Sequence, residues 1–352
     1  MSNRVVTGGG DDLVPSGVPA VDIDEPRRGT SWARYALGKA GGALISLLMV
    51  IVLGFFAFRI LPGDPVRSLT HGRRVSVDQL EAIRRELGLD QPLPAQFWRY
   101  LTDLLRGDLG YSYTNNEDVS QLILDRMGPT LLLTGTAFAI SLALGLWLGQ
   151  RAAWRRGSLF DRVHTGIALT LWSVPTFWFG LLLLLLFAGT LHWFPTGGMV
   201  TAGADLEGIA AVLDVARHLV LPAITMAAVV YAQYLLVMRA SLLEEMTADY
   251  LVTARAKGLN EDRVRRVHAV PNALLPTVTL IFLAIGGLIS GGVSVETVFS
   301  WPGLGYLTFQ ALSAPDFPVL QGTFVVFSAI VIAMNFIADL VYRVLDPRLR
   351  TA

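Results

Sequence analysis

Residues 247–276, TADYLVTARAKGLNEDRVRRVHAVPNALLP, form a polar and basic island between two long apolar segments. The island predicts two short helices joined by a glycine turn, because Thr247 can cap the first helix and Gly258 stands where a left-handed C-cap is wanted. Asn260 can cap the second helix, which Pro271 is expected to end. A solvated basic loop is the alternative interpretation, but it does not explain the caps or the turn. The pattern therefore favours an ordered docking element, which we call the elbow.

The composition of the whole chain is that of a polytopic membrane protein. Of its 352 residues, 53% are apolar, and the mean hydropathy of +0.52 is too high for an ordinary soluble domain. Acidic and basic residues number 28 each, so the net charge gives no indication of a nucleic-acid partner. The sequence contains no cysteine, which excludes disulfides, thiolate metal sites and a cysteine nucleophile.

Six apolar stretches are each long enough to cross the hydrocarbon core of a membrane as a helix. They span residues 36–58, 127–148, 165–190, 219–238, 273–295 and 319–338. Arginines gather in the loops 149–164 and 239–272 and near the C-terminus, whereas the alternate short loops are poor in them. The positive-inside rule therefore places both termini in the cytoplasm. We expect an all-α integral membrane protein with six transmembrane helices.

The chain divides into a tail and a membrane domain. Residues 1–30 are rich in Gly, Pro and Asp and lack apolar periodicity, so they are expected to be a disordered cytoplasmic tail. Residues 31–352 form the membrane domain. Within it, 59–126 is an extracytoplasmic insertion between the first two helices, and 239–272 is the cytoplasmic loop that holds most of the elbow.

The insertion has the pattern of a small helical subdomain. Ser76 and Gln79 can form a capping box at the start of one helix. A second helix is expected after Pro94, with an apolar face made by Phe97, Trp98, Leu101, Leu104 and Leu105. The sequence GDLG at 107–110 is then expected to turn the chain. Such a subdomain can be a lid on the membrane helices or a contact for a delivery partner, and the sequence leaves both open.

Catalytic and cofactor chemistry find no support in the sequence. No phosphate-binding GxxxxGK[ST] motif occurs, the five histidines show no metal-ligand spacing, and no nucleophile motif is present. We therefore expect no catalytic residue, cofactor or metal in this chain. The glycines inside apolar stretches have a spacing that suits close helix packing: Gly145 with Gly149, and Gly286, Gly287, Gly291 and Gly292.

An ion-coupled carrier is the main alternative to an ATP-driven transporter. Such a carrier requires an acidic group near the membrane midplane. Glu296 and Asp339 lie at the ends of apolar stretches, and Asn335 is uncharged, so they support a carrier weakly. Asp339 is better explained as an anchor near Arg343. If transport is driven by ATP, another subunit must bind the nucleotide.

The elbow and several other segments together resemble a known family. DYLVTARAKGL at 249–259, followed by His268, Asn272 and Leu275-Pro276, is similar to the EAA loop of ABC importer permease subunits, in the form of the dipeptide/oligopeptide branch. Further matches run in order along the chain: LPGDP at 61–65, LGLD at 87–90, GDLG at 107–110, Pro175 with FW at 177–178, ETVF at 296–299, WPGLG at 301–305 and DPR at 346–348. The subunit type resembles the DppB/OppB one.

The resemblance implies a type I ABC importer permease fold and a set of partners. These are a second homologous permease subunit, two ATPase subunits or domains, an extracytoplasmic substrate-binding protein and membrane lipid. The ATPases would bind ATP and Mg, and this chain would form half of the route for di- or oligopeptides through the bacterial cytoplasmic (inner) membrane. Nickel and glutathione are alternative cargoes that the resemblance allows.

The resemblance also implies roles for individual residues. It assigns ATPase coupling to the elbow residues Asp249, Tyr250, Ala254, Arg255, Ala256, Lys257, Gly258 and Leu259. Small side chains at Ala254 and Ala256 suit close docking to a partner, and Arg255 and Lys257 are expected to add charge pairing at the rim of its groove. On the outer side, we expect an outer gate or a contact with the binding protein at Glu296, Phe299, Trp301, Pro302 and Gly303.

Overall fold

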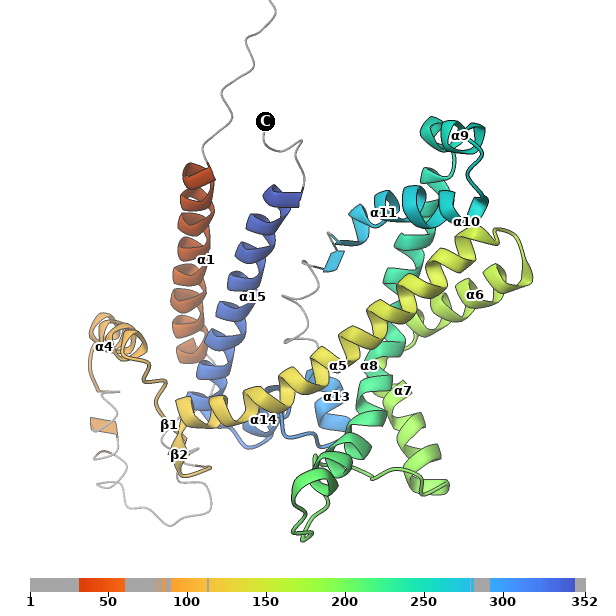
Figure 1. The fold of residues 1–352 in the computed structure, drawn as a ribbon. Coiled ribbons are helices and arrows are strands. Elements are labelled where there is room, and N and C mark those ends of the chain that lie inside the picture. Colours follow the sequence, from red (N-terminus) through yellow and green to blue (C-terminus); the bar gives the residue numbers. More distant parts are fainter. Residues whose placement is uncertain are drawn as a thin grey trace, which may run out of the picture.

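The computed structural model describes residues 32–60, 81, 84–85, 90–112, 114–278, 280–281 and 292–345, which fold mainly into helices (Figure 1). Three predicted features lie largely or wholly outside these residues. They are the tail 1–30, most of the helix expected from Ser76, and much of the apolar stretch 273–295.

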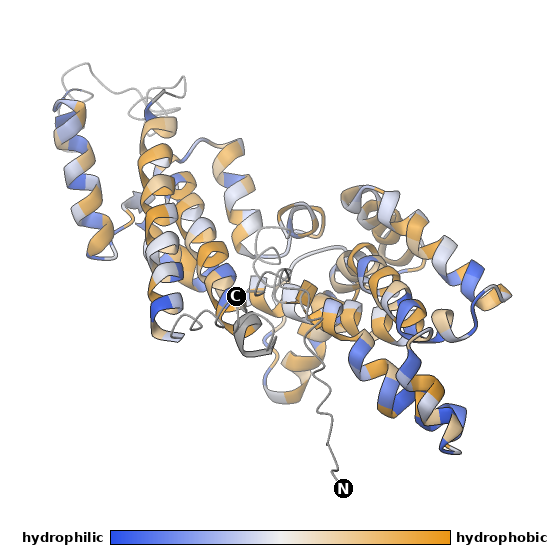
Figure 2. Cartoon of the chain, turned by 90° about the horizontal axis from the view of Figure 1, so that it is seen from above, coloured by the Kyte–Doolittle hydropathy of each residue, from blue (hydrophilic) through white to orange (hydrophobic). Residues whose placement is uncertain are grey.

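Four long helices correspond to four of the six apolar stretches: α1 (Trp32–Ile60), α5 (Val119–Trp154), α8 (Gly208–Glu245) and α15 (Phe317–Leu345). Each is long and apolar enough to cross a membrane. Hydrophobic residues run along most of their length (Figure 2), and large ones such as Leu44, Leu48 and Leu53 of α1 lie on the surface. Such an apolar exterior is expected of helices whose solvent is lipid.

The sequence predicts a single transmembrane helix over residues 165–190, but the structure breaks this stretch into two parts. It contains most of α6 (Leu159–Ser173), then α7 (Thr176–Leu183), which continues as the π-helix η1 (Leu184–Thr190). The two parts are bent by 105° at Val174-Pro175. Val174 is extended because a following proline disfavours the helical conformation, and Pro175 has no N–H for the helical ladder. The described residues thus hold four spans, or up to five if the bent pair is one span, so six helices and their orientation stay predictions.

Shorter elements connect the long helices. Between α1 and α5 lie α4 (Leu93–Leu105) and an antiparallel hairpin of β1 (Tyr111–Ser112) and β2 (Glu117–Asp118). The elbow holds α9 (Asp249–Ala256), α10 (Glu261–Arg263), the π-helix η2 (Val264–Ala269) and α11 (Val270–Ala273). Before α15 come α13 (Val293–Val298) and α14 (Leu304–Ser313).

The close approach of α5 to α8 holds the centre of the fold together. A Cβ on Gly145 would lie 2.8 Å from the carbonyl oxygen of Tyr231, and a Cβ on Gly149 would lie 2.7 Å from that of Leu235. Since a real Cβ does not approach so closely, only glycine at these two positions lets the backbones meet. The spacing of Gly145 and Gly149 therefore serves helix packing, as the sequence predicts.

An ion pair and a close packing contact are among the features that join α1 to α15. Lys39 Nζ lies 2.9 Å from Asp339 Oδ2, and Gly54 lies so close to Phe324 that a Cβ would come within 2.9 Å of its ring. Asp339 is therefore an anchor, as expected, but its ion-pair partner in the structure is Lys39 on the other helix. The side chain of Arg343, the neighbour that the sequence suggests, lies outside the described residues.

The insertion contains the predicted second helix and turn, and also a hairpin that was not predicted from the sequence. α4 begins one residue before Pro94, and Phe97 packs against Phe55 of α1 with ring centroids 5.2 Å apart. Trp98 and Leu105 remain exposed, so the apolar face is only partly covered. Gly107 and Gly110 take positive φ values of 81° and 92° in the predicted turn.

A buried hydrogen bond fixes the hairpin to the last long helix. Ser112 Oγ of β1 donates to Asp316 Oδ2 at 2.7 Å, and Asp316, just before α15, is 1% exposed. Ser112 Oγ also accepts from the backbone and side-chain nitrogens of Asn115 in the hairpin turn.

We expect Gly145→Val to destabilise the protein by about 1–3 kcal/mol, since an added side chain overpacks a filled interface. The measurement is the thermal unfolding midpoint of the purified protein in detergent. Gly135→Val on the same helix is the matched control, because a Cβ at Gly135 meets no atom within 4 Å. Equal midpoints for the two variants would contradict the packing role of Gly145.

Candidate functional site

The elbow begins where α8 ends. α8 continues to Glu245, and α9 starts four residues later at Asp249. Thr247 does not cap α9: its Oγ1 donates to the Glu244 carbonyl, 2.7 Å away, in the last turn of α8. The N-cap of α9 is Ala248, and Asp249 in the first turn complements the positive end of the helix dipole. The prediction of a Thr247 cap is wrong because the hydroxyl bonds to the preceding helix.

Gly258 ends α9 in the left-handed conformation, with a φ of +82°. Its N–H donates to the Arg255 carbonyl at 2.9 Å, and the Leu259 N–H donates to the Ala254 carbonyl at 3.4 Å. These two bonds make a Schellman C-cap. No atom lies within 4 Å of the place that a Cβ would take, so the backbone conformation alone favours glycine here. The predicted turn is confirmed, and its role in coupling stays a prediction.

The second half of the elbow starts as predicted and ends later than predicted. Asn260 Oδ1 accepts a hydrogen bond from the Arg263 N–H at 2.9 Å, which confirms the cap. The prediction that Pro271 ends this helix is wrong, since the chain stays helical through η2 and α11 to Ala273. The π-helical turn directly before Pro271 already departs from the bonding pattern that a proline interrupts.

One face of the elbow packs against the long helices of the same chain. Leu251 is fully buried and Ala254 is 7% exposed. Their apolar cluster is completed by Ala153 of α5, Met238 and Leu242 of α8, and Val264, Ala269 and Ala273 of the second half of the elbow. The small side chain of Ala254 therefore serves internal packing in this structure, whereas Ala256 is exposed as docking requires.

The hydroxyl of Tyr250 ties three parts of the elbow together. It donates to the carboxylate of Glu245 at the end of α8 and accepts from Asn272 Nδ2 at 2.9 Å. The same Asn272 nitrogen donates to the His268 carbonyl at 3.2 Å. Burial, and then the hydrogen bond to Glu245, raises the pKa of the Tyr250 phenol, so it stays neutral and able to donate. Tyr250 thus fixes α9 to both α8 and α11.

The other face of α9 is open. Val252 is 60% exposed, and Thr253, Ala256 and Lys257 are exposed beside it. Lys257 makes no ion pair with any residue that the structure describes. Arg255, in contrast, is paired within the elbow: its Nε lies 2.8 Å from Glu261 Oε1. Only Lys257 of the two predicted rim charges is therefore free for a partner in this structure.

The residues predicted for the outer side meet at the α13–α14 turn, and most are buried. Glu296 and Trp301 are 0% exposed and Phe299 is 2% exposed. The Glu296 carboxylate accepts from Thr130 Oγ1 of α5 at 2.8 Å and from the Tyr306 N–H at 3.0 Å. A buried carboxylate is tolerated only when such donors surround it.

Trp301 and Gly303 complete this junction with α5. Trp301 Nε1 donates to the Pro129 carbonyl at 2.9 Å, and a Cβ on Gly303 would collide with the carboxylate of Glu296. Pro302 alone among the five predicted residues is partly exposed. The side chains of Glu296, Phe299 and Trp301 support the turn from inside, Gly303 is buried beside them, and these four residues form no exposed contact surface in this structure. Their part in gating or partner contact stays a prediction.

Comparison with known proteins gives this architecture a family. Residues 141–351 match the binding-protein-dependent transport system inner membrane component family, and residues 32–134 match the N-terminal region of such components. The chain belongs to this family. It is a multi-pass membrane permease subunit of an ABC importer.

Relatives of the permease align with it almost end to end. A putative peptide permease of Brucella suis is 40% identical over 319 residues, which cover 90% of this chain and 99% of the relative. The dipeptide transport permease DppB of Escherichia coli is 35% identical, covering 90% and 98%. The glutathione transport permease GsiC of Pectobacterium atrosepticum is 38% identical, also covering 90% and 98%.

A solved structure supports the fold of the permease. The inward-facing MetNI methionine ABC transporter superposes with a TM-score of 0.50 at 18% identity, covering 64% of this chain and 97% of that chain. The likeness assigns the type I ABC importer permease fold. Subunits of this kind are not catalytic, which agrees with the lack of catalytic motifs in the sequence.

Two residues that organise these sites were missed from the sequence. Glu245 holds the Tyr250 hydroxyl, and Thr130 both donates to Glu296 and accepts from the Leu304 N–H at 2.8 Å. Thr130 gave a signal, since it is a polar residue directly after a proline inside an apolar stretch. Glu245 gave none, because acidic residues at a helix end are common.

We expect Tyr250→Phe to loosen α9 from the rest of the permease. A hydrogen bond to a charged group contributes about 1.5–3 kcal/mol, so backbone amides of α9 should exchange with solvent about tenfold faster or more. Hydrogen exchange followed by mass spectrometry measures this. Thr253→Ala is the control, because Thr253 lies on the open face and its hydroxyl donates to the Asp249 carbonyl within α9, at 3.4 Å. Unchanged exchange in Tyr250→Phe would show that the hydroxyl does not hold the elbow.

Proposed function

We propose that the permease is the membrane subunit of a peptide importer and that the elbow is its docking point for an ATPase. The observation that carries this is the two-sidedness of α9. One face is buried against α5 and α8, while Val252, Ala256 and Lys257 on the other face are exposed, and Lys257 has no ion-pair partner among the described residues. A short helix that is fixed to its own chain on one face and exposed on the other is suited to dock with a partner and to transmit its movement.

The assembly that we propose follows from the family. A second homologous permease completes the translocation route, two ATPase subunits or domains bind ATP and Mg, and an extracytoplasmic binding protein delivers the substrate. The complex resides in the bacterial cytoplasmic membrane, with the elbow on the cytoplasmic side. The arginines of the 149–164 and 239–272 loops support this orientation.

Coupling by rigid-body movement suits the geometry of the elbow. ATP favours the closed ATPase dimer by binding it more tightly than the open one, and closure draws the two elbows together. α9 cannot follow alone, since Leu251 is buried against α8 and Tyr250 is bonded to Glu245. The movement therefore passes into α5 and α8, which the glycine contacts hold as one pair.

Peptides are the cargo that we propose. Relatives named for peptide, dipeptide and glutathione transport share 35–40% identity with the permease over nearly its whole length. Glutathione is itself a small peptide, so these names agree on a class of short, polar solutes that carry amide bonds. Nickel, the other cargo allowed by the resemblance, is the competing hypothesis.

We expect Gly258→Val to uncouple transport from ATP hydrolysis while the permease still inserts. A β-branched residue in the left-handed conformation costs about 1–2 kcal/mol, which favours a reshaped turn and a displaced α9. The measurement is substrate uptake and ATPase rate in proteoliposomes of the complete complex. Gly258→Asn is the matched control, because asparagine tolerates positive φ. Wild-type uptake with wild-type ATPase stimulation in Gly258→Val would refute the role of this turn.

Reconstitution with the partners tests the function as a whole. We expect di- and tripeptide uptake that needs ATP and the binding protein, and that persists when ionophores remove the ion gradients. Unlabelled peptides should compete for uptake, and nickel should not. Uptake without the ATPases that collapses with the ion gradient would mark a secondary carrier instead.

A further inference from the structure

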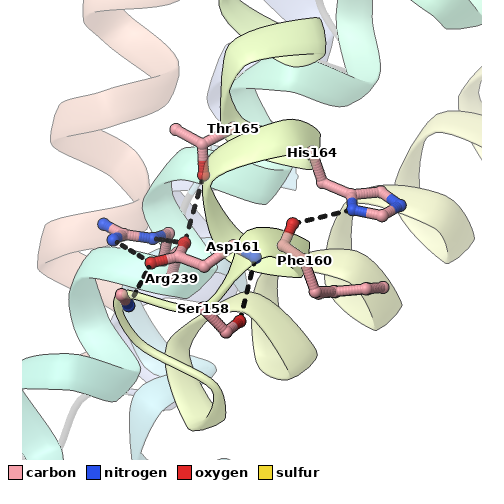
Figure 3. A network of polar contacts seen from close by, with 7 residues as sticks. Ser158, Phe160, Asp161, His164, Thr165 and Arg239 are labelled. Carbon is pink, nitrogen blue, oxygen red and sulfur yellow. Dashed lines mark hydrogen bonds and ion pairs between the residues drawn. The ribbon is translucent and has the colours of Figure 1, made fainter.

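A buried carboxylate on α6 gathers four hydrogen bonds close to the elbow. Asp161 is 3% exposed, and its two oxygens accept from Arg239 Nε at 2.6 Å and Arg239 Nη2 at 2.9 Å (Figure 3). The Gly157 N–H at 2.9 Å and Thr165 Oγ1 at 3.3 Å complete the set. The carboxylate is thus held on both sides, by a two-pronged arginine from α8 and by the start of its own helix.

The local structure of α6 aims Asp161 at α8. Ser158 caps α6 by accepting from the Asp161 N–H at 3.3 Å, which places Asp161 in the first turn (Figure 3). Further along, Ala168 is fully buried against Ala232 and Leu235 of α8. The two helices therefore meet through an apolar contact, and the ion pair fixes one end of it.

Arg239 belongs to the same part of α8 that carries the elbow. Its neighbours Met238 and Leu242 lie in the apolar cluster that buries Leu251 of α9. One turn of α8 thus holds α9 through apolar side chains and α6 through the guanidinium. A movement of the elbow that displaces this turn of α8 therefore also acts on α6, through the contact between Arg239 and Asp161.

The far end of α6 is the place where the chain bends. Ser173 is its last residue, and at Val174-Pro175 the chain turns by 105° into α7. Because Pro175 cannot donate a helical hydrogen bond, the backbone between the two helices bends most easily at this position. If α6 moves as one piece with the elbow, displacement at α9 is passed to this bend. If α6 slides on α8, the displacement is lost at the interface.

We propose that Asp161 and Arg239 are positioning residues for coupling, which lock α6 to the elbow so that movement of α9 reaches the α6–α7 bend. The inference rests on the proposed function of the elbow. A pair that serves stability alone has no need of ionic groups, since well-packed apolar residues often stabilise a buried site as well. The directional two-pronged contact instead fixes the register of one helix on the other.

The test uses Asp161→Asn in the full permease within its complete complex. Asparagine keeps the shape of the side chain and loses the charge that holds Arg239. At equal amounts of assembled complex, we expect the ratio of ATP hydrolysed to peptide transported to rise about tenfold, as for the loss of a typical coupling free energy between two sites. Lys39→Gln is the matched control, because it breaks the α1–α15 ion pair away from the elbow and should leave the ratio unchanged.

A distance measurement separates a positioning role from a merely stabilising one. The chain has no cysteine, so single cysteines at Leu159 of α6 and Val267 of η2, both exposed, accept spin labels cleanly. The distance distribution between them should be narrow in the wild type and in Lys39→Gln, and broad in Asp161→Asn. This measurement does not depend on transport. It therefore tests whether the ion pair fixes α6 relative to the elbow even if the wild-type complex does not import peptides and the proposed function is wrong.

A charge-preserving variant provides a second test in case Asp161→Asn does not fold. Arg239→Lys keeps the positive charge but loses the two-pronged contact, and we expect an intermediate rise in the ATP-to-peptide ratio. The exchanged pair Asp161→Arg with Arg239→Asp should restore part of the narrow distribution that Asp161→Asn loses. A wild-type ratio and a narrow distribution in both Asp161→Asn and Arg239→Lys would overturn the proposal.

Discussion

The fold depends on the contact between α5 and α8, where Gly145 and Gly149 let the two backbones touch. In a membrane the hydrophobic effect gives helices little reason to associate, so close packing must supply the attraction. Glycine at these positions allows that packing over a long face, since Tyr231, Leu235 and Met238 of α8 all come against the glycine backbone. Everything else in this half of the molecule attaches to the resulting pair.

The elbow depends on the α5–α8 pair, which provides the surface on which α9 packs. Nothing in α9 alone would keep eight residues helical in water, because short isolated helices are marginal. Its order comes from three sources: Leu251 and Ala254 packed on the pair, the Tyr250 hydrogen bonds, and the Schellman turn at Gly258. The packing and the Tyr250 bonds lie on the inner side of the helix and the turn lies at its end, so the outer side is left free for a partner.

What the sequence predicts well is what neighbouring residues determine. The Gly258 turn and the Asn260 cap are local, and both are found where expected. Errors arise where a group has more than one possible partner, or where its partner is far away in the sequence. Thr247 was free to bond backward as well as forward, and the partner of Glu296, Thr130, lies 166 residues away.

Hydropathy has a related weakness. The stretch 165–190 is predicted as one apolar span, because a hydropathy scale does not detect the bend at Val174-Pro175. Burial is equally invisible from sequence: Trp301 looks like a surface aromatic in a glycine-rich turn, yet its indole is enclosed against Pro129 of α5. The family resemblance singles out Pro175 and Trp301, and only the structure shows which side chains face inward.

α5 connects the two predicted functional ends of the permease. With 36 residues it is roughly 54 Å long at 1.5 Å per residue, more than the thickness of the hydrocarbon core. Near one end, Pro129 and Thr130 hold the Trp301 indole and the Glu296 carboxylate of the α13–α14 turn. At the other end, Ala153 lies in the cluster that seats α9. Since the Trp301 indole, the Glu296 carboxylate and Ala153 are all buried, we expect a tilt of α5 driven at the elbow to move the far turn as well, with the helix itself as the most direct connection between the two sites.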